Sequence, residues 1–256
     1  GSNLVLNHDY EDLGSELVDF PNASITLETG WSFTNGILTQ DGSGAGQGSS
    51  ADANISNTSF DLNKQYKFTI TVSSYTSGDL HLLLSPNTNV AFNINGTGEF
   101  TVYGGFYLAN NLHLRAGYGN FVGSISNLSI KQVDPNDRWS LTNTTISDGV
   151  LNFPDNSSAA QFAIHSNATM MDIGGTYEIT LTVNKTAGGV LKILSGTGGS
   201  DLTPAASVSS SGTHTFIVTN NTNGGRLFLY TTAGENFQGT VDNVTVREYA
   251  IQPQDV

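Results

Sequence analysis

The sequence predicts an all-β protein made of two tandem antiparallel β-sandwich domains, and three observations support this. Polar and apolar residues alternate strictly in segments such as YKFTITV (66–72) and YEITLTV (177–183), as they do in strands buried on one face. Small polar residues and 29 glycines separate these segments, which is typical of short strands joined by turns. The segments also recur in the same order, which indicates a duplicated unit.

The matched segments define the expected strands of each copy. In the first copy they cover residues 31–38, 66–72, 78–82, 96–102, 112–114 and 120–130. In the second copy they cover residues 139–151, 177–183, 189–193, 212–218, 227–229 and 236–246. Proline and turn-forming residues interrupt the pattern at Asp134-Pro135-Asn136-Asp137, so we expect domains at 1–133 and 134–256.

The alternation also assigns side chains to faces. Trp31 and Trp139 occupy the same position in the two copies, beside alternating apolar residues, and are expected in the cores. His81 and His113 alternate with leucines on expected strands, so we predict that both face solvent.

Charge and cysteine content exclude several classes of partner. The chain has 22 Asp and Glu against 9 Lys and Arg, a net charge of −13, which disfavours binding to nucleic acid or to anionic membranes. No apolar run approaches the roughly 20 residues that span a bilayer, so no membrane insertion is expected. The chain has no cysteine, so disulfides and thiolate metal sites play no part.

No catalytic constellation is visible in the sequence. The five histidines are scattered without zinc-ligand spacing, and no nucleophile elbow or phosphate-binding loop is present. A glycosidase would need two carboxylates across a cleft, and no convincing pair exists on the expected strands. We therefore predict a non-enzymatic protein with no catalytic residue.

Acidic residues near the N-terminus form one candidate metal site. Asp9, Glu11 and Asp12, with Glu16 nearby, are the densest acidic cluster, and carboxylates are the oxygen ligands that calcium prefers. The spacing differs from that of an EF-hand loop. The sequence thus offers a calcium site as the one cofactor hypothesis, with a solvated turn as the alternative.

Asp242 is a second candidate calcium ligand. It shares strand parity with Val244 and Val246, which are expected to point inward. A buried unpaired carboxylate is costly, so Asp242 needs a cation, an arginine, backbone N–H groups, or a bulge that turns it outward.

Several aromatic residues in unmatched or loop segments are candidates for contact with a glycan or a protein partner. An exposed flat ring can stack on a sugar, and amides nearby can bind its hydroxyls. The alternative is an edge strand or a contact between copies of the chain in a homo-oligomer. The candidates are Tyr75, Tyr103, Phe106, Tyr107 and Tyr118.

Specific motifs resemble known families. The stretch NLVLNHDYEDLG (3–14) resembles the opening of carbohydrate-binding-module jelly rolls. The motifs GWSF (30–33), YTSG (75–78) and NFVGSISNLSI (120–130) resemble a tandem β-sandwich repeat of marine phage (cyanophage-type) structural and tail-fibre proteins. The second copy repeats this pattern with RWSL, YEITLTV and NFQGTVDNVTV.

This resemblance implies jelly-roll, galactose-binding-like domains and a structural or adhesive role. The chain would be a virion component (a tail fibre, appendage or capsid decoration), located in the virion or extracellularly. Its partners would be other virion proteins or a host surface polysaccharide. The rival hypothesis is a carbohydrate-binding module of a carbohydrate-active enzyme, and a hydrolase is a third without support in the residues.

Overall fold

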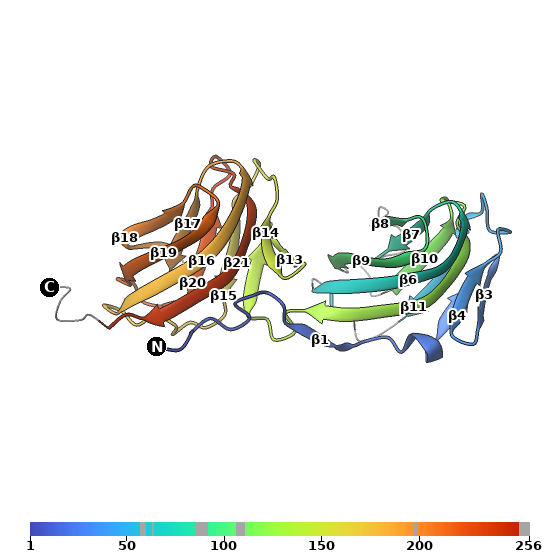
Figure 1. Cartoon of the computed structure of the whole chain (residues 1–256), viewed down its shortest axis with the longest axis horizontal. Coiled ribbons are helices and arrows are strands. Elements are labelled where there is room, and N and C mark those ends of the chain that lie inside the picture. The colour runs from blue at the N-terminus through green and yellow to red at the C-terminus, as the bar shows by residue number, and fades with distance from the viewer. Residues whose placement is uncertain (57–59, 63, 85–91, 106–110, 197–198, 251–256) are drawn as a thin grey trace. The chain divides into compact units, whose positions relative to one another are not determined.

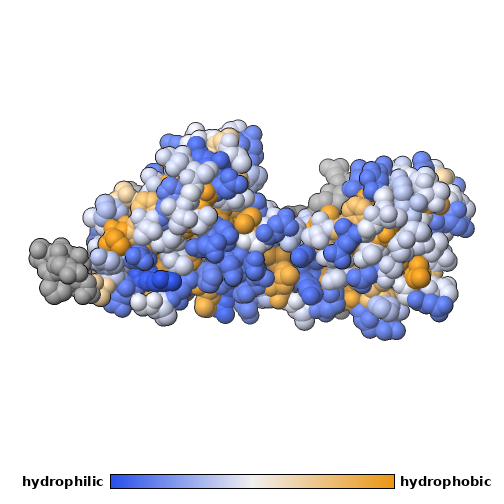
Figure 2. Space-filling model, in the orientation of Figure 1, coloured by the Kyte–Doolittle hydropathy of each residue, from blue (hydrophilic) through white to orange (hydrophobic). Residues whose placement is uncertain are grey.

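The computed structural model describes residues 1–256 except 57–59, 63, 85–91, 106–110, 197–198 and 251–256. These described residues form antiparallel strands and one short 3-10 turn at Phe20–Asn22 (η1), so the predicted all-β fold class is confirmed (Figure 1). Among the described residues, no helix is long and apolar enough to cross a membrane. The surface shown in Figure 2 is mostly hydrophilic, with apolar residues in small separated groups.

The chain divides into two compact units. The first, which we call the N-terminal sandwich, comprises Leu13–Val133. The second, the C-terminal sandwich, comprises Asp134–Val256 together with Gly1–Asp12, a segment that we call the N-terminal strap. The sequence assigned residues 1–133 to the first domain, whereas the structure places the strap with the second.

Two sheets form the N-terminal sandwich. One has the order β3 (Trp31–Thr34), β4 (Ile37–Gln40), β11 (Val122–Val133), β6 (Gln65–Ser77), β9 (Gly98–Gly105), and β1 (Leu13–Glu16) also pairs with β11. The other has the order β2 (Ile25–Leu27), β5 (Gly48–Ser56), β10 (Asn111–Gly117), β7 (Leu80–Leu83), β8 (Phe92–Ile94). Alternate residues of both sheets, including Phe68, Ile70, Leu82 and Leu114, fill the core between them.

One continuous sheet folds into the C-terminal sandwich. Its order is β12 (Trp139–Thr142), β15 (Gln161–His165), β20 (Leu227–Thr231), β17 (Leu191–Ser195), β18 (Ser200–Val208), β19 (Gly212–Thr219), β16 (Thr176–Ala187), β21 (Gln238–Glu248), β14 (Val150–Phe153), β13 (Thr145–Ser147). Strand β18 pairs with β17 along most of its length and with β19 through Thr203, which joins the two layers.

The N-terminal strap completes the edge of β21. Strand β14 pairs with β21 only at Gly239–Val241, so the remainder of that edge of β21 needs another partner. The strap provides it, since Leu4 N donates to Val246 O at 2.9 Å and His8 O accepts from Val244 N at 2.9 Å. In the N-terminal sandwich, β1 takes the corresponding place beside β11.

Both tryptophans are buried, as predicted, and each donates its indole N–H to a backbone carbonyl. Trp31 is 7% exposed and bonds Ala51 O, while Trp139 is 5% exposed and bonds Asn7 O in the strap. The ring of Tyr10 lies 5.2 Å from that of Trp139, centroid to centroid. The strap is therefore part of the core around Trp139.

Candidate functional site

The predicted metal ligands lie in one sandwich but do not form a recognisable metal centre. Asp9, Glu11 and Asp12 lie in the strap and Asp242 lies on β21. Among the described residues, no group of three or more His, Cys, Asp or Glu is arranged to hold a metal ion. Glu16 instead accepts a hydrogen bond from Ile130 N at 2.6 Å in the N-terminal sandwich. The calcium hypothesis stays a prediction.

A β-bulge explains how Asp242 avoids the core. The register of β16 and β21 shifts between Thr180 and Thr182, so both Val241 and Val244 point inward and Asp242 is only half-buried. Asn243 adopts a positive φ of 51° and donates to the Asp242 carboxylate from its backbone N at 2.6 Å. Of the four alternatives set out from the sequence, the structure shows two together, the bulge and a backbone N–H donor.

Three of the five predicted contact aromatics lie among the described residues, on or beside strands of both sheets of the N-terminal sandwich. Tyr118, 66% exposed, follows β10, and the guanidinium carbon of Arg115 lies 5.6 Å from its ring centroid. Tyr75 lies on β6 and is 37% exposed, while Tyr103 lies on β9 opposite Lys67, in the other sheet from β10. The remaining two, Phe106 and Tyr107, lie outside the described residues.

The outward side of the β5–β10–β7 sheet carries a polar network, which we call the polar face: Asp52, Asn54, His81, His113 and Arg115. Small or aliphatic residues between them, such as Ala53 and Leu114, point into the core. The register places Asp52 opposite Arg115 and Asn54 opposite His113. Directly opposite side chains in an antiparallel pair lie close enough to interact, and Arg115 and Asp52 form an ion pair.

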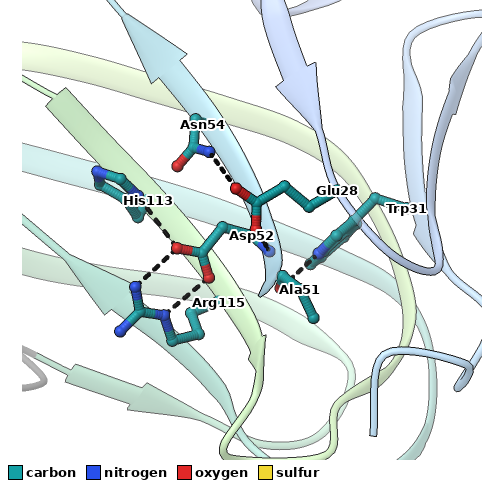
Figure 3. Close-up of polar contacts among 7 residues, drawn as sticks. All are labelled: Glu28, Trp31, Ala51, Asp52, Asn54, His113 and Arg115. Atoms are coloured by element: carbon teal, nitrogen blue, oxygen red, sulfur yellow. Dashed lines mark hydrogen bonds and ion pairs between the residues drawn. The ribbon is translucent and has the colours of Figure 1, made fainter. Parts of the chain in front are cut away.

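A bidentate ion pair is the centre of the polar face (Figure 3). Arg115 donates from Nε to Asp52 Oδ1 and from Nη2 to Asp52 Oδ2, both at 2.7 Å. His113 Nδ1 lies 3.2 Å from Asp52 Oδ2. Burial alone would raise the pKa of Asp52, but the hydrogen bonds from Arg115 and His113 outweigh it and lower the pKa. The same carboxylate raises the pKa of Arg115.

Glu28 extends the network through two hydrogen bonds from residues of β5. Its Oε2 accepts from Asp52 N at 3.0 Å and its Oε1 accepts from Asn54 Nδ2 at 3.3 Å (Figure 3). The prediction that His113 faces solvent is wrong, because this outward side chain is buried within the network and the residue is 8% exposed. His81 is half-buried. Alternation identified the correct face of the sheet but not what the side chains meet there.

The corresponding surface of the C-terminal sandwich carries aromatic rings. We call it the aromatic face: Phe162, Ile164, Lys192, Phe228 and Tyr230, on β15, β20 and β17. Here too the intervening residues Ala163, Ile193 and Leu229 are fully buried and point into the core. The register places Tyr230 between Phe162 on β15 and Lys192 on β17.

The rings of the aromatic face form a continuous row. Phe162 and Phe228 stack with centroids 5.3 Å apart and an interplanar angle of 19°. Phe228 and Tyr230 follow at 5.7 Å and 37°. Phe162, Tyr230 and Lys192 are half-buried, so parts of these side chains remain accessible. Such a row can stack on the apolar face of a pyranose ring while the phenol and ammonium groups bind its hydroxyls.

Sequence reasoning missed both faces, although one signal was present. The repeat aligns Leu112-His113-Leu114 with Leu227-Phe228-Leu229, so an outward histidine in one copy corresponds to an outward phenylalanine in the other. This difference between the copies indicates that the fold does not determine which side chain stands at these outward positions.

No protein-family model matches the chain, and no curated protein matches it. Solved structures similar to it include the tandem CBM22-1–CBM22-2 domain of Paenibacillus barcinonensis Xyn10C. That likeness has 12% identity and a TM-score of 0.31, and covers 92% of this chain and 98% of that one. A variant of the family 29 carbohydrate-binding module CBM29-2 has 15% identity, coverages of 43% and 82%, and a TM-score of 0.30.

A fucolectin from striped bass (Morone saxatilis) serum is also similar, with 10% identity, coverages of 98% and 94%, and a TM-score of 0.29. Because these scores are low, function has to be inferred from the chain's own residues.

Proposed function

We propose that the chain is a non-enzymatic glycan-binding protein that holds saccharide on the aromatic face of its C-terminal sandwich. The observation that carries the proposal is the stacked row of Phe162, Phe228 and Tyr230 on the outward side of a sheet. A core needs no aromatic residues on this side, because Ala163, Ile193 and Leu229 already fill the interior. Half-buried rings held by neighbouring strands provide the rigid flat surface that sugar stacking requires.

The biological setting is part of the same proposal. The motifs NFVGSISNLSI and NFQGTVDNVTV support a virion appendage that adheres to a host surface polysaccharide, and a strongly acidic, cysteine-free chain is compatible with that location. A carbohydrate-binding module of a carbohydrate-active enzyme is the alternative setting. Light scattering separates them: an oligomer favours virion assembly, and a monomer that retains polysaccharide favours the binding module.

The binding test uses the full chain on a glycan array, followed by calorimetry with the best saccharide. The double variant Phe162→Ala/Tyr230→Ala should weaken binding at least tenfold, because both accessible rings are lost. The control Thr180→Ala/Thr215→Ala alters an outward, hydrogen-bonded pair on β16 and β19 of the same sandwich and should bind normally. Equal binding by wild type and the aromatic variant, or no saccharide bound at all, would refute the proposal.

A further inference from the structure

The polar face holds three buried side-chain atoms that have no hydrogen-bond partner among the described residues. They are Asn54 Oδ1, His113 Nε2 and His81 Nδ1. In the described part of the N-terminal sandwich there are no others, since the remaining four belong to the C-terminal sandwich. An unpartnered buried polar atom costs free energy, so three on one face mark a place where water or a bound molecule supplies the missing partners.

These three atoms lie on adjacent strands. Strand β10 pairs with β5 on one side and β7 on the other, with Asn54 directly opposite His113 and His81 directly opposite Arg115. The ion pair of Asp52 with Arg115 links β5 to β10. The three atoms therefore lie within one small region of the sheet, and one small ligand bound there would adjoin more than one of them.

The donor or acceptor character of the unpartnered atoms shows which hydrogen-bonding groups the ligand must supply. Asp52 is ionised and can only accept, so the tautomer that fits carries its proton on His113 Nδ1, and in that tautomer Nε2 is an acceptor. Asn54 donates its Nδ2 to Glu28, which leaves Oδ1 as an acceptor. Two neighbouring acceptors fit a ligand with two neighbouring donors, and the vicinal hydroxyls of a sugar are such a pair.

Charge selects among sugars. The carboxylates of Asp52 and Glu28 lie within the network and Asp79 lies near His81, whereas Arg115 is the one fixed cation among these side chains. Burial lowers the pKa of His81; Asp79 opposes this shift and Arg115 adds to it, so the imidazole is neutral at pH 7. An anionic sugar would be repelled by the excess negative charge.

The exposed ring of Tyr118 borders the polar face beside Arg115. It was among the aromatics predicted to contact a glycan. Its position gives a ligand on the polar face one stacking surface in addition to the hydrogen bonds.

We infer that the polar face is a second ligand site, which binds a neutral saccharide through vicinal hydroxyls that donate to Asn54 Oδ1 and His113 Nε2. The inference rests on the proposed glycan-binding function for its ligand class. It goes further in assigning a second site with different selectivity. The aromatic face binds the apolar face of a ring, whereas the polar face binds hydroxyl groups and rejects acidic sugars.

The test is calorimetry of the full chain against two probes that differ in charge: neutral oligosaccharides and uronic-acid oligosaccharides. Three proteins are compared: wild type, His113→Phe, and the aromatic-face variant Phe162→Ala/Tyr230→Ala. His113→Phe removes the acceptor and copies the residue at the equivalent position, Phe228, while the ion pair of Asp52 with Arg115 stays intact. Thr69→Ala, on the opposite sheet of the same sandwich, is the matched control.

We expect wild type to bind a neutral saccharide at two sites. His113→Phe should weaken binding at the polar face at least tenfold, whereas the aromatic-face variant should lose binding at the aromatic face and retain it at the polar face. Uronic acids should not bind at this site. Asn54→Ala should reproduce the loss, and it serves as the second variant if His113→Phe does not fold. The melting transition reported by Trp31 fluorescence establishes folding of the N-terminal sandwich.

The outcomes separate this inference from the proposed function. If the aromatic-face variant loses all saccharide binding while His113→Phe and Asn54→Ala bind as wild type does, the inference is overturned and the proposed function stands. If binding depends on His113 and Asn54 alone, the inference stands and the aromatic site fails. A crystal soaked in neutral saccharide that shows only water on the polar face also overturns the inference.

Discussion

The polar face and the aromatic face occupy equivalent positions in two copies of one sandwich, yet they share almost no chemistry. Asp52 and Arg115, opposite one another on β5 and β10, correspond to Phe162 and Tyr230 on β15 and β20. The other equivalent pairs are Asn54 with Ile164, His113 with Phe228, His81 with Lys192, and Leu83 with Leu194.

The difference shows which residues the fold constrains. Inward positions keep the same character in both copies, because they must fill the space between two sheets. Outward positions are constrained only by one another. A buried aspartate without its arginine would be costly, so Asp52 and Arg115 can be exchanged for an aromatic pair only together. Two residues directly opposite one another on neighbouring strands, which we call a register pair, therefore have to change together when one face is converted into the other.

The largest predicted effect concerns the segments that pair with β21 and β11. In the C-terminal sandwich this segment is the strap, and in the N-terminal sandwich it is β1. Deleting residues 1–12 should destabilise the C-terminal sandwich by about 3–6 kcal/mol, because the buried Val5 and Tyr10 lose their packing and β21 loses its partner. The measurement is urea unfolding monitored by fluorescence. A Trp31→Phe chain reports the C-terminal sandwich through Trp139, and a Trp139→Phe chain reports the N-terminal one.

The N-terminal sandwich should unfold at the same urea concentration with and without the strap. A shift of the Trp31 transition instead would mean that residues 1–12 stabilise the first sandwich, as the sequence alone had indicated.

The next effect tests whether the register pair is exchanged as a unit. Arg115→Met should destabilise the N-terminal sandwich by about 3–5 kcal/mol, since it leaves the buried Asp52 carboxylate unpaired. The double variant Asp52→Phe/Arg115→Tyr copies Phe162 and Tyr230 and should recover most of that loss. Thermal unfolding followed through Trp31 measures both. A double variant no more stable than Arg115→Met would show that the faces are not interchangeable.

The sequence predicted the fold because the signal for the central strands is strong. Alternating large apolar residues mark β6, β11, β16 and β21, and the buried tryptophans were identified from their repeated position. Both faces were missed for one physical reason, namely that part of each lies on a strand with a weak pattern. The inward residues of β5 include Ala51 and Ala53, and β15 offers Ala163, so period-two alternation in hydrophobicity is faint there.

The strap was assigned to the wrong sandwich for a related reason. Its apolar residues predict an extended, partly buried segment, but nothing in that pattern says which edge it joins. The partner depends on β14 being too short to cover β21, a property of the assembled sheet. The bulge at Asp242 was foreseen only as one of several ways to keep a carboxylate out of the core.

A smaller difference between the sandwiches should emerge on acidification. Burial lowers the pKa of His165, against the opposing effects of the Leu6 backbone and Asp134. The unfolded chain therefore takes up this proton at higher pH than the folded one, and stability is full above about pH 6.5 and falls as the pH drops below it. Asp52 is an acid whose pKa is lowered in the folded protein. The stability that its ionised carboxylate contributes is therefore lost only below about pH 4.

Between pH 7 and pH 5 the Trp139 transition should thus shift to lower temperature more than the Trp31 transition, since His81, the comparable residue of the N-terminal sandwich, is only half-buried. His165→Gln should flatten the pH dependence of the Trp139 transition. Parallel shifts of both transitions would contradict this assignment to His165.

The smallest predicted effect lies on the sheet opposite the aromatic face. Thr180 and Thr215 face each other on β16 and β19, with their hydroxyl oxygens 3.0 Å apart. This pair is exposed, so Thr215→Ala should cost only about 0.2–1 kcal/mol, measured as a small decrease in the urea midpoint of the Trp139 transition. Saccharide binding to the aromatic face should not change, because the altered side chain points away from the core on the other layer. A loss of binding in Thr215→Ala would locate the ligand on the β16–β19 face, and the comparison between the two faces would then need a different starting point.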